Sequence, residues 1–248
     1  MGQRDYFFSK LEDAVDFATN KGLTVYLDFY EPSIQMLTER EIARFPQCDC
    51  VHFGGQEYSE RKMLAIFPAS SLPDNASFPI ACVQIKTKRI ELTHSDVLGA
   101  LMGLGIEREK VGDINICDDL IQIFVCESLG EFVVNNLNKI GRHEVSPIQV
   151  ELSEVQEIQP VFVVADLIVA SMRLDAIVHT VFKLSRSEAS GYVKGEKVKV
   201  NHVPTLKPAA TLKQGDIVSV RSKGRFIVDE QLGTTKKGNI KLRIKKFS

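Results

Sequence analysis

The sequence has no apolar run long enough to cross a membrane. Its longest runs, such as residues 160–165 (PVFVVA), fall far short of the roughly 20 apolar residues that a membrane helix requires. The first 17 residues, MGQRDYFFSKLEDAVDF, contain no apolar signal core and are too acidic for a transit peptide. We therefore expect a cytoplasmic protein whose five cysteines stay reduced.

Metal-binding motifs are also scarce. Cys48, Cys50 and His52 alternate, so a strand would turn all three toward one face, but structural zinc normally takes a fourth ligand and no second cysteine pair follows. We interpret these cysteines as buried strand residues, which is the commonest environment of free cysteine. The other cysteines are expected in the core of the middle region: Cys82, Cys117 and Cys126. The sequence thus predicts no metal site and no cofactor.

Glycine-rich and acid–base motifs do not indicate catalysis. The glycines of GALMGLG (99–105) lie within and at the end of a predicted helix, so close helix packing and a C-cap explain them better than nucleotide binding does. His94 and Asp96 precede that helix without a Ser or Cys nucleophile motif, and Ser95 or Asp96 is expected as its N-cap. We therefore expect a protein without enzymatic activity.

Positive charge is sparse before residue 172 and concentrated after it. Residues 172–248 contain 17 Lys and Arg against 6 Asp and Glu, whereas residues 1–171 contain 14 against 26. Apolar residues recur at regular spacing within the basic part, which indicates a folded β-rich module and not a disordered arm. A folded basic surface predicts binding to a phosphate backbone. The acidic remainder should present protein contacts or local basic spots: Lys86, Lys88 and Arg89.

We expect an α+β protein with three domains. Residues 1–75 alternate helix and strand patterns, which predicts a small α/β domain, and the Pro- and Ser-rich stretch 68–79 is typical of a linker. Residues 76–160 predict the order βαββαβ, the ferredoxin-like arrangement of RRM domains, with the second helix over 129–140. The aromatic RNP1 pattern that stacks bases on an RRM sheet is missing, so we predict the fold without that binding mode.

Residues 172–248 are predicted to form two short helices beside a small twisted sheet. An i, i+3, i+4, i+7 apolar pattern predicts the first helix over 173–183. Ser185 and Glu188 form a capping-box pattern, so the second helix is expected over 186–192. Strand patterns follow at 197–201, 216–221, 225–230 and 240–246.

The basic module has the chemistry of an anion-binding surface. Arg186 opens the second helix, where exposed amides and the helix dipole favour an anion. Lys197 and Lys199 alternate with valines, so one strand face should be cationic and the other buried. This module resembles the S4 RNA-binding domain, and the resemblance rests on Arg173-Leu174-Asp175, SRSEA (185–189), KGEKVKVN (194–201) and Gly215-Asp216.

The resemblance extends along the chain to the YlmH family, bacterial S4-domain proteins of the cytosol. It rests on FGGQEYSERK (53–62), LTHSDVLGALMGLGIEREKVGDI (92–114), SVRSKGRF (219–226) and TKKG (235–238). Two positions depart from the family pattern. Ser222 replaces a glycine, which bears on the conformation of its loop because glycine reaches positive φ freely, and Ser95 replaces an arginine, which removes a charge from the middle domain.

The resemblance implies an N-terminal α/β domain, an RRM-like middle domain and a C-terminal S4 domain. It also implies a role on the large ribosomal subunit, where such proteins resemble quality-control factors that help to hold a peptidyl-tRNA on stalled, split ribosomes while a tail is added to the nascent chain. In many bacteria the family is encoded near cell-division genes. An arginine at the position of Arg173 lies beside the anion site in S4 domains.

These features together predict a monomeric, non-enzymatic protein that docks on structured ribosomal RNA of the large subunit, with tRNA as a further partner and no membrane contact. RNA helices hide their major-groove bases, so a compact basic module with few exposed aromatics should read phosphate geometry and 2′-hydroxyls. The residues expected to contact RNA are Arg173, Ser185, Arg186, Ser187, Lys194, Lys197, Lys199, Asn201, Lys207, Arg221, Lys223, Arg225, Lys236 and Lys237.

Two alternatives stay open: an RNA-modifying enzyme and a cell-division scaffold that acts through the acidic domains. Arg173-Leu174-Asp175 is similar to the catalytic segment of pseudouridine synthases, but there the S4 domain precedes a large catalytic domain, whereas here it follows the other domains. We expect Asp175 to pair locally at the start of its helix. An S4-linked methyltransferase would need a Gly-rich cofactor loop after a strand, which the sequence lacks.

Overall fold

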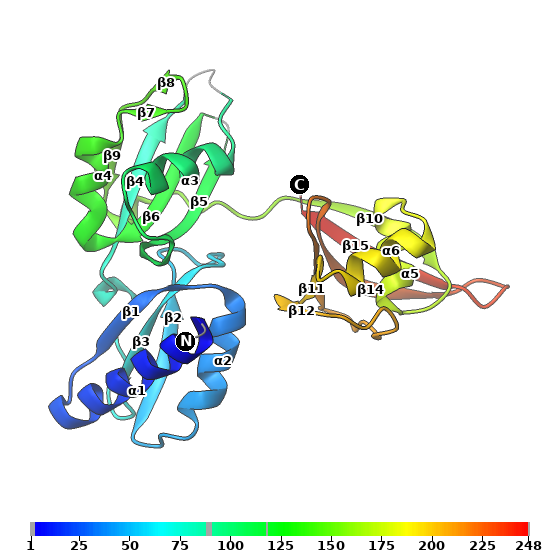
Figure 1. The fold of residues 1–248 in the computed structure, drawn as a ribbon, viewed down its shortest axis with the longest axis horizontal. Coiled ribbons are helices and arrows are strands. Elements are labelled where there is room, and N and C mark those ends of the chain that lie inside the picture. The colour runs from blue at the N-terminus through cyan, green and yellow to red at the C-terminus, as the bar shows by residue number, and fades with distance from the viewer. Residues whose placement is uncertain (1–2, 88–90, 118, 248) are drawn as a thin grey trace. The chain divides into compact units, whose positions relative to one another are not determined.

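The structure, a computed structural model, describes residues 3–87, 91–117 and 119–247. The chain forms two compact units, residues 1–158 and residues 159–248 (Figure 1). Each unit has hydrophobic clusters of its own. In the described part of the chain, no helix is both long and apolar enough to cross a membrane.

The first unit begins with a three-stranded antiparallel sheet that carries two helices. Its elements are α1 (Gln3–Lys21), β1 (Val25–Tyr30), α2 (Pro32–Ile42), β2 (Cys48–Phe53) and β3 (Lys62–Pro68), in the strand order β1-β3-β2. Leu11, Val15 and Ala18 recur at helical spacing in α1 and are buried against Leu64 and Ile66 of the central strand. The helix and strand patterns predicted within residues 1–75 are confirmed.

A four-stranded antiparallel sheet completes the first unit. Its elements are β4 (Ile80–Lys86), α3 (His94–Gly103), β5 (Val111–Cys117), β6 (Leu120–Cys126), α4 (Gly130–Asn136) and β9 (Ile148–Val150), joined by the 3₁₀ turns η1 (Asn75–Ser77), η2 (Arg108–Lys110), η3 (Glu127–Leu129) and η4 (Leu152–Glu154). The strand order β5-β6-β4-β9 confirms the predicted ferredoxin-like arrangement. One face packs on α3 and α4 through Val83, Ile123 and Val133.

The second helix of this sheet is shorter than predicted. A helix was expected over 129–140, but α4 ends at Asn136, and Leu137 leaves the helical region with φ −84° and ψ 74°. The next residues form a two-stranded ribbon, β7 (Lys139–Ile140) paired with β8 (His143–Glu144). The asparagines that surround Leu137 favour turns over helix interiors, which explains the early end.

The start of α3 also differs from the prediction, because its N-cap is Thr93 and not Ser95 or Asp96. Thr93 Oγ1 accepts a hydrogen bond from the amide of Asp96 at 3.3 Å, and the Asp96 carboxylate accepts one from the amide of Thr93 at 2.8 Å. This reciprocal capping box satisfies two amides that would otherwise lack partners.

Burial was predicted correctly for some small residues of this region and wrongly for others. Cys82 and Cys126 are buried as expected, whereas Cys117 is exposed at the end of β5. Gly105 follows α3 with φ 81°, as expected of a C-terminal glycine. Gly99 and Gly103 lie on the solvent side of α3, and an added Cβ at either would have nothing within 4 Å. The prediction that these two glycines allow close helix packing is therefore wrong.

The sheet face that RRM domains open to RNA is covered here. Phe124 and Cys82 lie on this face, fully buried in one cluster with Phe29 and Met63 of the first sheet. Phe78, near the end of the stretch predicted as a linker, is buried in the same cluster, whereas most of that stretch is exposed. Bases cannot stack on a face that is filled by protein. The division of this unit into two domains at residue 75 stays a prediction.

Two glycines allow the sheets of the first unit to approach each other. Gly55, which follows β2 with φ 93°, would place an added Cβ 2.4 Å from a ring carbon of Phe124. Gly112 in β5 would place one 2.7 Å from a ring carbon of Phe29. Both distances are far below van der Waals contact, so a larger residue at either position must displace the neighbouring ring.

The second unit is a six-stranded antiparallel sheet with two helices (Figure 1). Its elements are β10 (Phe162–Val169), α5 (Leu174–Phe182), α6 (Arg186–Lys194), β11 (Val198–Val200), β12 (Val203–Pro204), β13 (Ile217–Val220), β14 (Gly224–Thr234) and β15 (Ile240–Phe247), in the order β10-β15-β14-β13-β11-β12. Ile177 and Val178 of α5 pack with Phe226 in the core. The helices and strands predicted for residues 172–248 are confirmed, and β10 adds an edge strand before them by pairing with β15.

Candidate nucleic-acid interface

Helix α6 presents a capped, positively charged end. Ser185 Oγ accepts from the Glu188 amide at 3.1 Å and the Glu188 carboxylate accepts from the Ser185 amide at 2.7 Å, which confirms the predicted capping box. Arg186 is exposed at the first helical position, and Ser187 Oγ lies 3.1 Å from Ser185 Oγ. Within the described residues the amides of Arg186 and Ser187 have no acceptor. The free amides, the helix dipole and the Arg186 guanidinium therefore all favour an anion at the start of α6.

Arg173 occupies the N-cap position of α5 without a side-chain capping bond, and it pairs with Asp175. Arg173 Nε donates to Asp175 Oδ1 at 3.0 Å and Nη2 donates to Oδ2 at 2.6 Å, which confirms the local pairing expected for Asp175. The pKa of Asp175 is lowered mainly by its hydrogen bonds with Arg173, and Arg186 lowers it further. Arg173 and Arg186 therefore lie in the field of one carboxylate, which offsets part of their charge.

The outer face of the sheet carries cations opposite the buried valines. Lys199 of β11 lies beside Ser219 of β13, and Ser219 lies beside Arg225 of β14. Their strand neighbours face the core, as the alternation predicted. The guanidinium carbon of Arg225 lies 4.3 Å from the centre of the Phe247 ring, a cation–π distance that orients the side chain over the sheet.

Lys197, Arg221 and Lys223 lie near α6. Lys197 Nζ is 5.4 Å from the centre of the Tyr192 ring, and the Arg221 amide donates to the Lys197 carbonyl at 2.8 Å. The pKa of Glu188 is lowered mainly by hydrogen bonds with Ser185 and also by Lys223, so the turn after β13 lies near the start of α6. We call the following residues the basic face: Arg173, Arg186, Lys197, Lys199, Arg221, Lys223 and Arg225.

The turn of the basic face contains Ser222 at φ 63°, so the serine adopts the conformation for which the family has glycine. A left-handed residue other than glycine costs about 1 to 2 kcal/mol, and glycine loses roughly 0.5 to 1 kcal/mol more conformational freedom on folding, so Ser222→Gly should raise the free energy of unfolding by about 0.5 kcal/mol. Urea denaturation measures the change. Ser219→Gly, in extended β13, is the matched control and should lower stability. A less stable Ser222→Gly variant would contradict the proposed strain.

Four other predicted RNA contacts are exposed at separate places in the second unit. Lys194 lies in the last turn of α6, at the opposite end from Arg186. Lys207 lies in the loop between β12 and β13. In the same loop, the carbonyls of Pro208 and Ala210 accept hydrogen bonds from the first amides of α5. Lys236 and Lys237 lie in the turn between β14 and β15. The structure therefore does not gather all the predicted residues on one surface, and contact by these four with RNA stays a prediction.

Asn201 holds its own turn. Its Nδ2 donates to Asp216 Oδ1 at 2.9 Å, and its Oδ1 accepts from the amide of Ile217 at 2.9 Å. Asn201 and His202 both have positive φ, 49° and 66°, which is the conformation of a two-residue hairpin turn between β11 and β12. The amide is thus used inside the protein, and a direct RNA contact by Asn201 stays a prediction.

Lys183 is an exposed cation that the sequence patterns did not single out. It is the C-cap of α5, left-handed with φ 52°, in the short turn before α6 begins. The turn could have been predicted, because the apolar helix pattern of α5 ends just before the capping box of α6. Other cations are engaged within the sheet: Arg243 pairs with Asp166 at 2.8 Å, and Lys245 pairs with Asp229 at 2.8 Å. Their charge is partly offset by these carboxylates.

The alternating residues of β2 differ in burial: Cys48 is buried, whereas Cys50, which was also predicted to be buried, and His52 are only half-buried. Cys48 is buried as predicted, with its Sγ 3.3 Å from Thr19 Oγ1. Burial raises the pKa of the Cys50 thiol to about 12 and lowers the pKa of His52 to about 4. Among the residues that the structure describes, no group of three His, Cys, Asp or Glu side chains is arranged to hold a metal ion.

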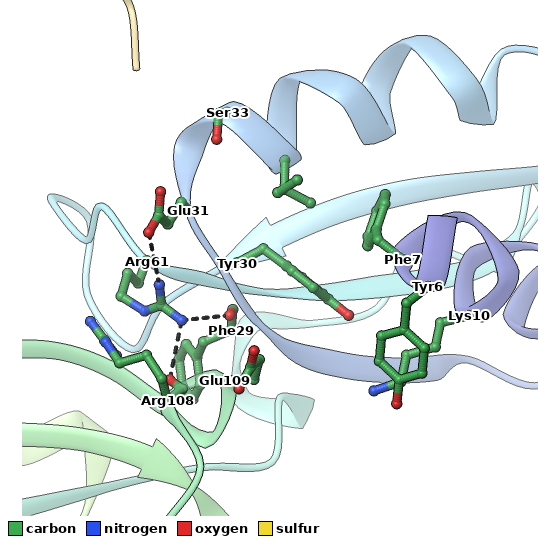
Figure 2. A pocket seen from close by; sticks show the side chains of 11 residues that line it. Tyr6, Phe7, Lys10, Phe29, Tyr30, Glu31, Ser33, Arg61, Arg108 and Glu109 are labelled. Atoms are coloured by element: carbon green, nitrogen blue, oxygen red, sulfur yellow. Dashed lines mark hydrogen bonds and ion pairs between the residues drawn. The ribbon is translucent and has the colours of Figure 1, made fainter. Parts of the chain in front are cut away.

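The acidic first unit has two arginines that were not predicted as functional. Of the basic spots expected there, Lys86 is exposed at the end of β4, and Lys88 and Arg89 lie outside the described residues. Arg61 and Arg108 instead meet beside a pocket near the start of α2 (Figure 2). They come from the two stretches of this unit that carry the family resemblance, 47 residues apart in the chain. No local pattern indicates such a meeting.

Two family models match the chain. Residues 73–154 match the model described as "Putative RNA-binding domain in YlmH", and residues 172–218 match the S4 domain. The first match covers the ferredoxin-like sheet with its helices, and the second covers α5, α6, β11, β12 and the first half of β13. Both models therefore coincide with elements described above.

Known proteins resemble the chain over most of its length. The Ribosome-associated protein quality control protein P2 of Bacillus subtilis (strain 168) is 30% identical over 212 residues, which cover 85% of this chain and 82% of that protein. Among solved structures, the Cell division protein ylmH from Streptococcus pneumoniae is similar with a TM-score of 0.53 and 25% identity, over 62% of this chain and 95% of that chain.

Proposed function

Because the chain belongs to the YlmH family of S4-domain RNA-binding proteins, we propose that it docks on structured RNA of the large ribosomal subunit through the basic face. The observation that carries the proposal is the start of α6, where exposed Arg186 stands beside two amides without acceptors in the described part of the chain. A phosphate bound there would meet backbone N–H groups, the helix dipole and a guanidinium together.

The proposed role is ribosome-associated quality control. It is supported by the name of the Bacillus subtilis relative, whose match spans both units of this chain. We further propose that the protein acts as a cytoplasmic monomer and that a peptidyl-tRNA held beside the large subunit is a second RNA partner. The cations outside the basic face, among them Lys236 and Lys237 in the β14–β15 turn, are candidates for that second contact.

Recognition is proposed to depend on RNA shape and charge more than on base sequence. The basic face consists of Lys and Arg side chains with helix amides, groups that bind phosphates and 2′-hydroxyls. Its two cation–π pairs among the described residues, Arg225 with Phe247 and Lys197 with Tyr192, each place a cation over the aromatic ring. Binding should therefore weaken steeply with salt, by roughly 0.7 to 0.9 in log–log slope for each phosphate contact.

The first unit is proposed to contribute mainly protein contacts. Residues 1–158 carry 14 basic against 25 acidic side chains, which repels RNA over most of this surface. The sheet face that an RRM would use is buried against the first sheet. Any RNA contact by this unit must therefore be local.

We assign no catalytic residue. Asp175, the position similar to the catalytic aspartate of pseudouridine synthases, is held by two hydrogen bonds from Arg173. An RNA-modifying enzyme remains a candidate only by that local similarity. A cell-division scaffold is the other candidate, because the similar solved structure is titled a cell division protein.

Crosslinking the protein to RNA in cells and sequencing the recovered RNA tests the proposal. We expect one or a few helices of large-subunit ribosomal RNA to be enriched, because a rigid basic face fits a limited number of RNA shapes. Recovery without any preference for ribosomal RNA would contradict it. Protein partners that persist after RNase treatment would favour the scaffold, and a lost ribosomal RNA modification in a deletion strain would favour the enzyme.

A further inference from the structure

The first unit contains a pocket of about 500 Å³ where helix α2 begins. Figure 2 shows Arg61 and Arg108 at one end of this pocket and Tyr6, Phe7 and Tyr30 toward the other. Small-molecule sites typically have volumes of about 300 to 1,000 Å³ and combine apolar walls with a few polar groups. The lining also includes Lys10 and the carboxylates of Glu31 and Glu109, so its charged side chains are three cations and two anions. A pocket with a net positive lining and aromatic walls has the composition of a site for an aromatic anion.

Arg61 is held rigidly, with one side of its guanidinium left for a further acceptor. Its side chain is 11% exposed. Its Nε donates to the Val111 carbonyl at 2.9 Å. Its Nη2 donates to the carbonyls of Phe29 at 2.8 Å and Arg108 at 3.2 Å (Figure 2). Among the described residues Nη1 has no hydrogen bond, and its one carboxylate contact is a long one of 3.9 Å to Glu31 Oε1.

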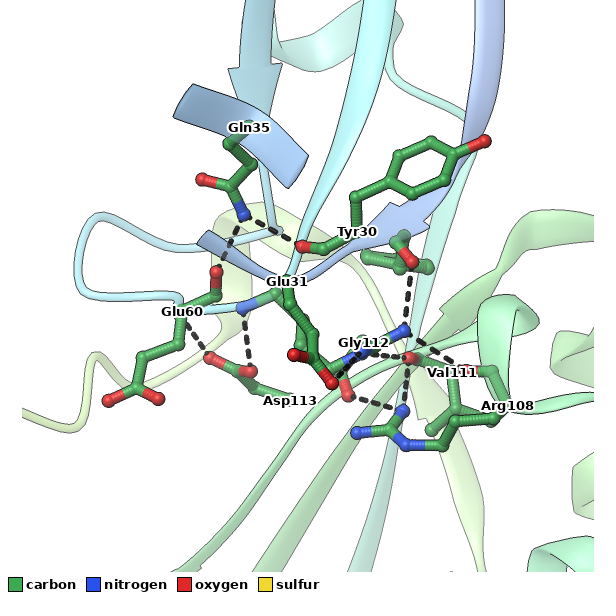
Figure 3. Close-up of polar contacts among 10 residues, drawn as sticks. Tyr30, Glu31, Gln35, Glu60, Arg108, Val111, Gly112 and Asp113 are labelled. Atoms are coloured by element: carbon green, nitrogen blue, oxygen red, sulfur yellow. Dashed lines mark hydrogen bonds and ion pairs between the residues drawn. The ribbon is translucent and has the colours of Figure 1, made fainter. Parts of the chain in front are cut away.

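Arg61 is a buried cation next to a second one. Burial and, to a smaller extent, the neighbouring Arg108 together lower its pKa to about 10. Arg108 Nη1 donates to the Val111 carbonyl at 2.6 Å (Figure 3), and among the described residues no carboxylate forms an ion pair with its guanidinium. The carboxylates of Glu31, Glu109 and Asp113 offset part of this positive charge from a distance. In the described part of the chain none of them makes a side-chain hydrogen bond to Nη1 of Arg61, so a bound anion would add a direct contact there.

Helix α2 adds an amide donor to the same end of the pocket. Its N-cap, Glu31, makes no side-chain capping bond, and Pro32 has no N–H. The amides of Ile34 and Gln35 donate to the Glu31 carbonyl at 2.9 and 3.1 Å, so in the described part of the chain the Ser33 amide is left without an acceptor. Ser33 also lines the pocket with its hydroxyl. The dipole of this 11-residue helix favours an anion there.

The other end of the pocket offers aromatic surfaces. The rings of Phe7 and Tyr30 meet edge to face with centroids 5.0 Å apart. Tyr6 is 57% exposed, and Lys10 Nζ lies 4.7 Å from the centre of its ring. Burial raises the pKa of Tyr30 to about 12, so its hydroxyl stays neutral. Such rings are the surfaces on which planar bases stack.

We propose that this pocket binds a nucleoside phosphate, with the phosphate on Arg61, Arg108 and the Ser33 amide and the base against Tyr6 and Tyr30. Guanidinium groups match phosphate oxygens in geometry as well as charge. Glu31, whose side chain is 57% exposed, can turn away from Arg61 when the phosphate enters. The ligand is either a free mononucleotide or the terminal nucleotide of an RNA, because the two share this chemistry. The site lies within the first unit and is separate from the basic face.

Ser33→Asp tests the site without disturbing the core. An acidic residue in the first turn favours a helix, but its carboxylate repels a phosphate, so the affinity for AMP and GMP should fall about tenfold or more. Ser95→Asp, at the second position of α3 as Ser33 is in α2, is the matched control and should bind as the wild type does. Titration calorimetry on the full chain measures affinity, and thermal unfolding checks the fold.

Arg108→Gln is a second variant for the same test and should also weaken nucleotide binding about tenfold, the cost of one charge-assisted contact. If AMP, GMP, CMP and UMP at millimolar concentration do not bind the wild type, the proposal is overturned. It is also overturned if Ser33→Asp and Ser95→Asp lose affinity equally, because the phosphate would then not sit at the start of α2.

Competition identifies the source of the nucleotide. Displacement of bound AMP by a short RNA with a 5′-phosphate, but not by the same RNA with a 5′-hydroxyl, supports an RNA end as the ligand. Displacement by neither RNA supports a free nucleotide. The Arg186→Glu/Lys199→Glu variant should bind AMP as the wild type does, so failure of this pocket and failure of the basic face are distinguishable.

Discussion

The double substitution Arg186→Glu/Lys199→Glu is expected to lower the affinity for large-subunit ribosomal RNA about 100-fold or more, because each charge-assisted contact contributes about 1.5 to 3 kcal/mol. Both side chains are exposed, one at the start of α6 and one on the outer sheet face. Neither belongs to the buried core of the second unit, so the fold should be retained. Filter binding or anisotropy over a range of salt concentrations measures the loss.

The salt dependence separates a local contact from a general effect of charge. Loss of two phosphate contacts should reduce the log–log salt slope by about 1.4 to 1.8. The matched control is Lys213→Glu/Lys241→Glu, which makes the same change of charge at exposed positions outside the basic face. It should lose much less affinity. Unchanged binding by Arg186→Glu/Lys199→Glu, or an equal loss in the control, would show that RNA binds elsewhere.

Gly55→Ala is expected to destabilise the first unit by about 3 kcal/mol. The new methyl group would lie 2.4 Å from the Phe124 ring, and overpacking of this kind costs typically about 1 to 3 kcal/mol. The backbone adds about 1 to 2 kcal/mol, because φ is 93° at this position. For a unit of this size the midpoint of thermal unfolding should fall by about 6 to 12 °C.

A second glycine isolates the packing contribution to that loss. Gly105 also has positive φ, 81°, but an added Cβ there meets nothing within 4 Å, so Gly105→Ala should cost only the backbone share of about 1 to 2 kcal/mol. Calorimetric unfolding of both variants measures the difference. Neither should change RNA binding by the second unit, which has its own core. Equal destabilisation by the two variants would refute close packing of Gly55 on Phe124.

Features encoded by neighbouring residues could be predicted from the sequence. The capping box of Ser185 and Glu188 is a pattern of four consecutive residues, and the structure contains both of its hydrogen bonds. Helix α5 follows from apolar residues three and four positions apart. Where competing local preferences were closely balanced, prediction failed: the helix expected over 129–140 ends at Asn136, and Thr93 caps α3.

The sequence could not predict which residues of a strand face are buried. Phe124 and Cys117 both lie in strands that were correctly predicted, yet Phe124 is fully buried and Cys117 is exposed. The difference arises because the first sheet covers one part of the second and not the end of β5. Strand alternation says which residues share a face, but it does not say what packs on that face.

The sequence by itself determined the class of elements, the ferredoxin-like order of the middle strands and the concentration of cations after residue 172. Only the tertiary structure decided that the RRM-like face is covered, and that Arg61 and Arg108 meet beside a pocket at the start of α2. The physical reason is the range of the interactions. Helix caps and strand alternation depend on residues a few positions apart, whereas a covered face or a pocket depends on segments that are brought together only when the whole unit packs.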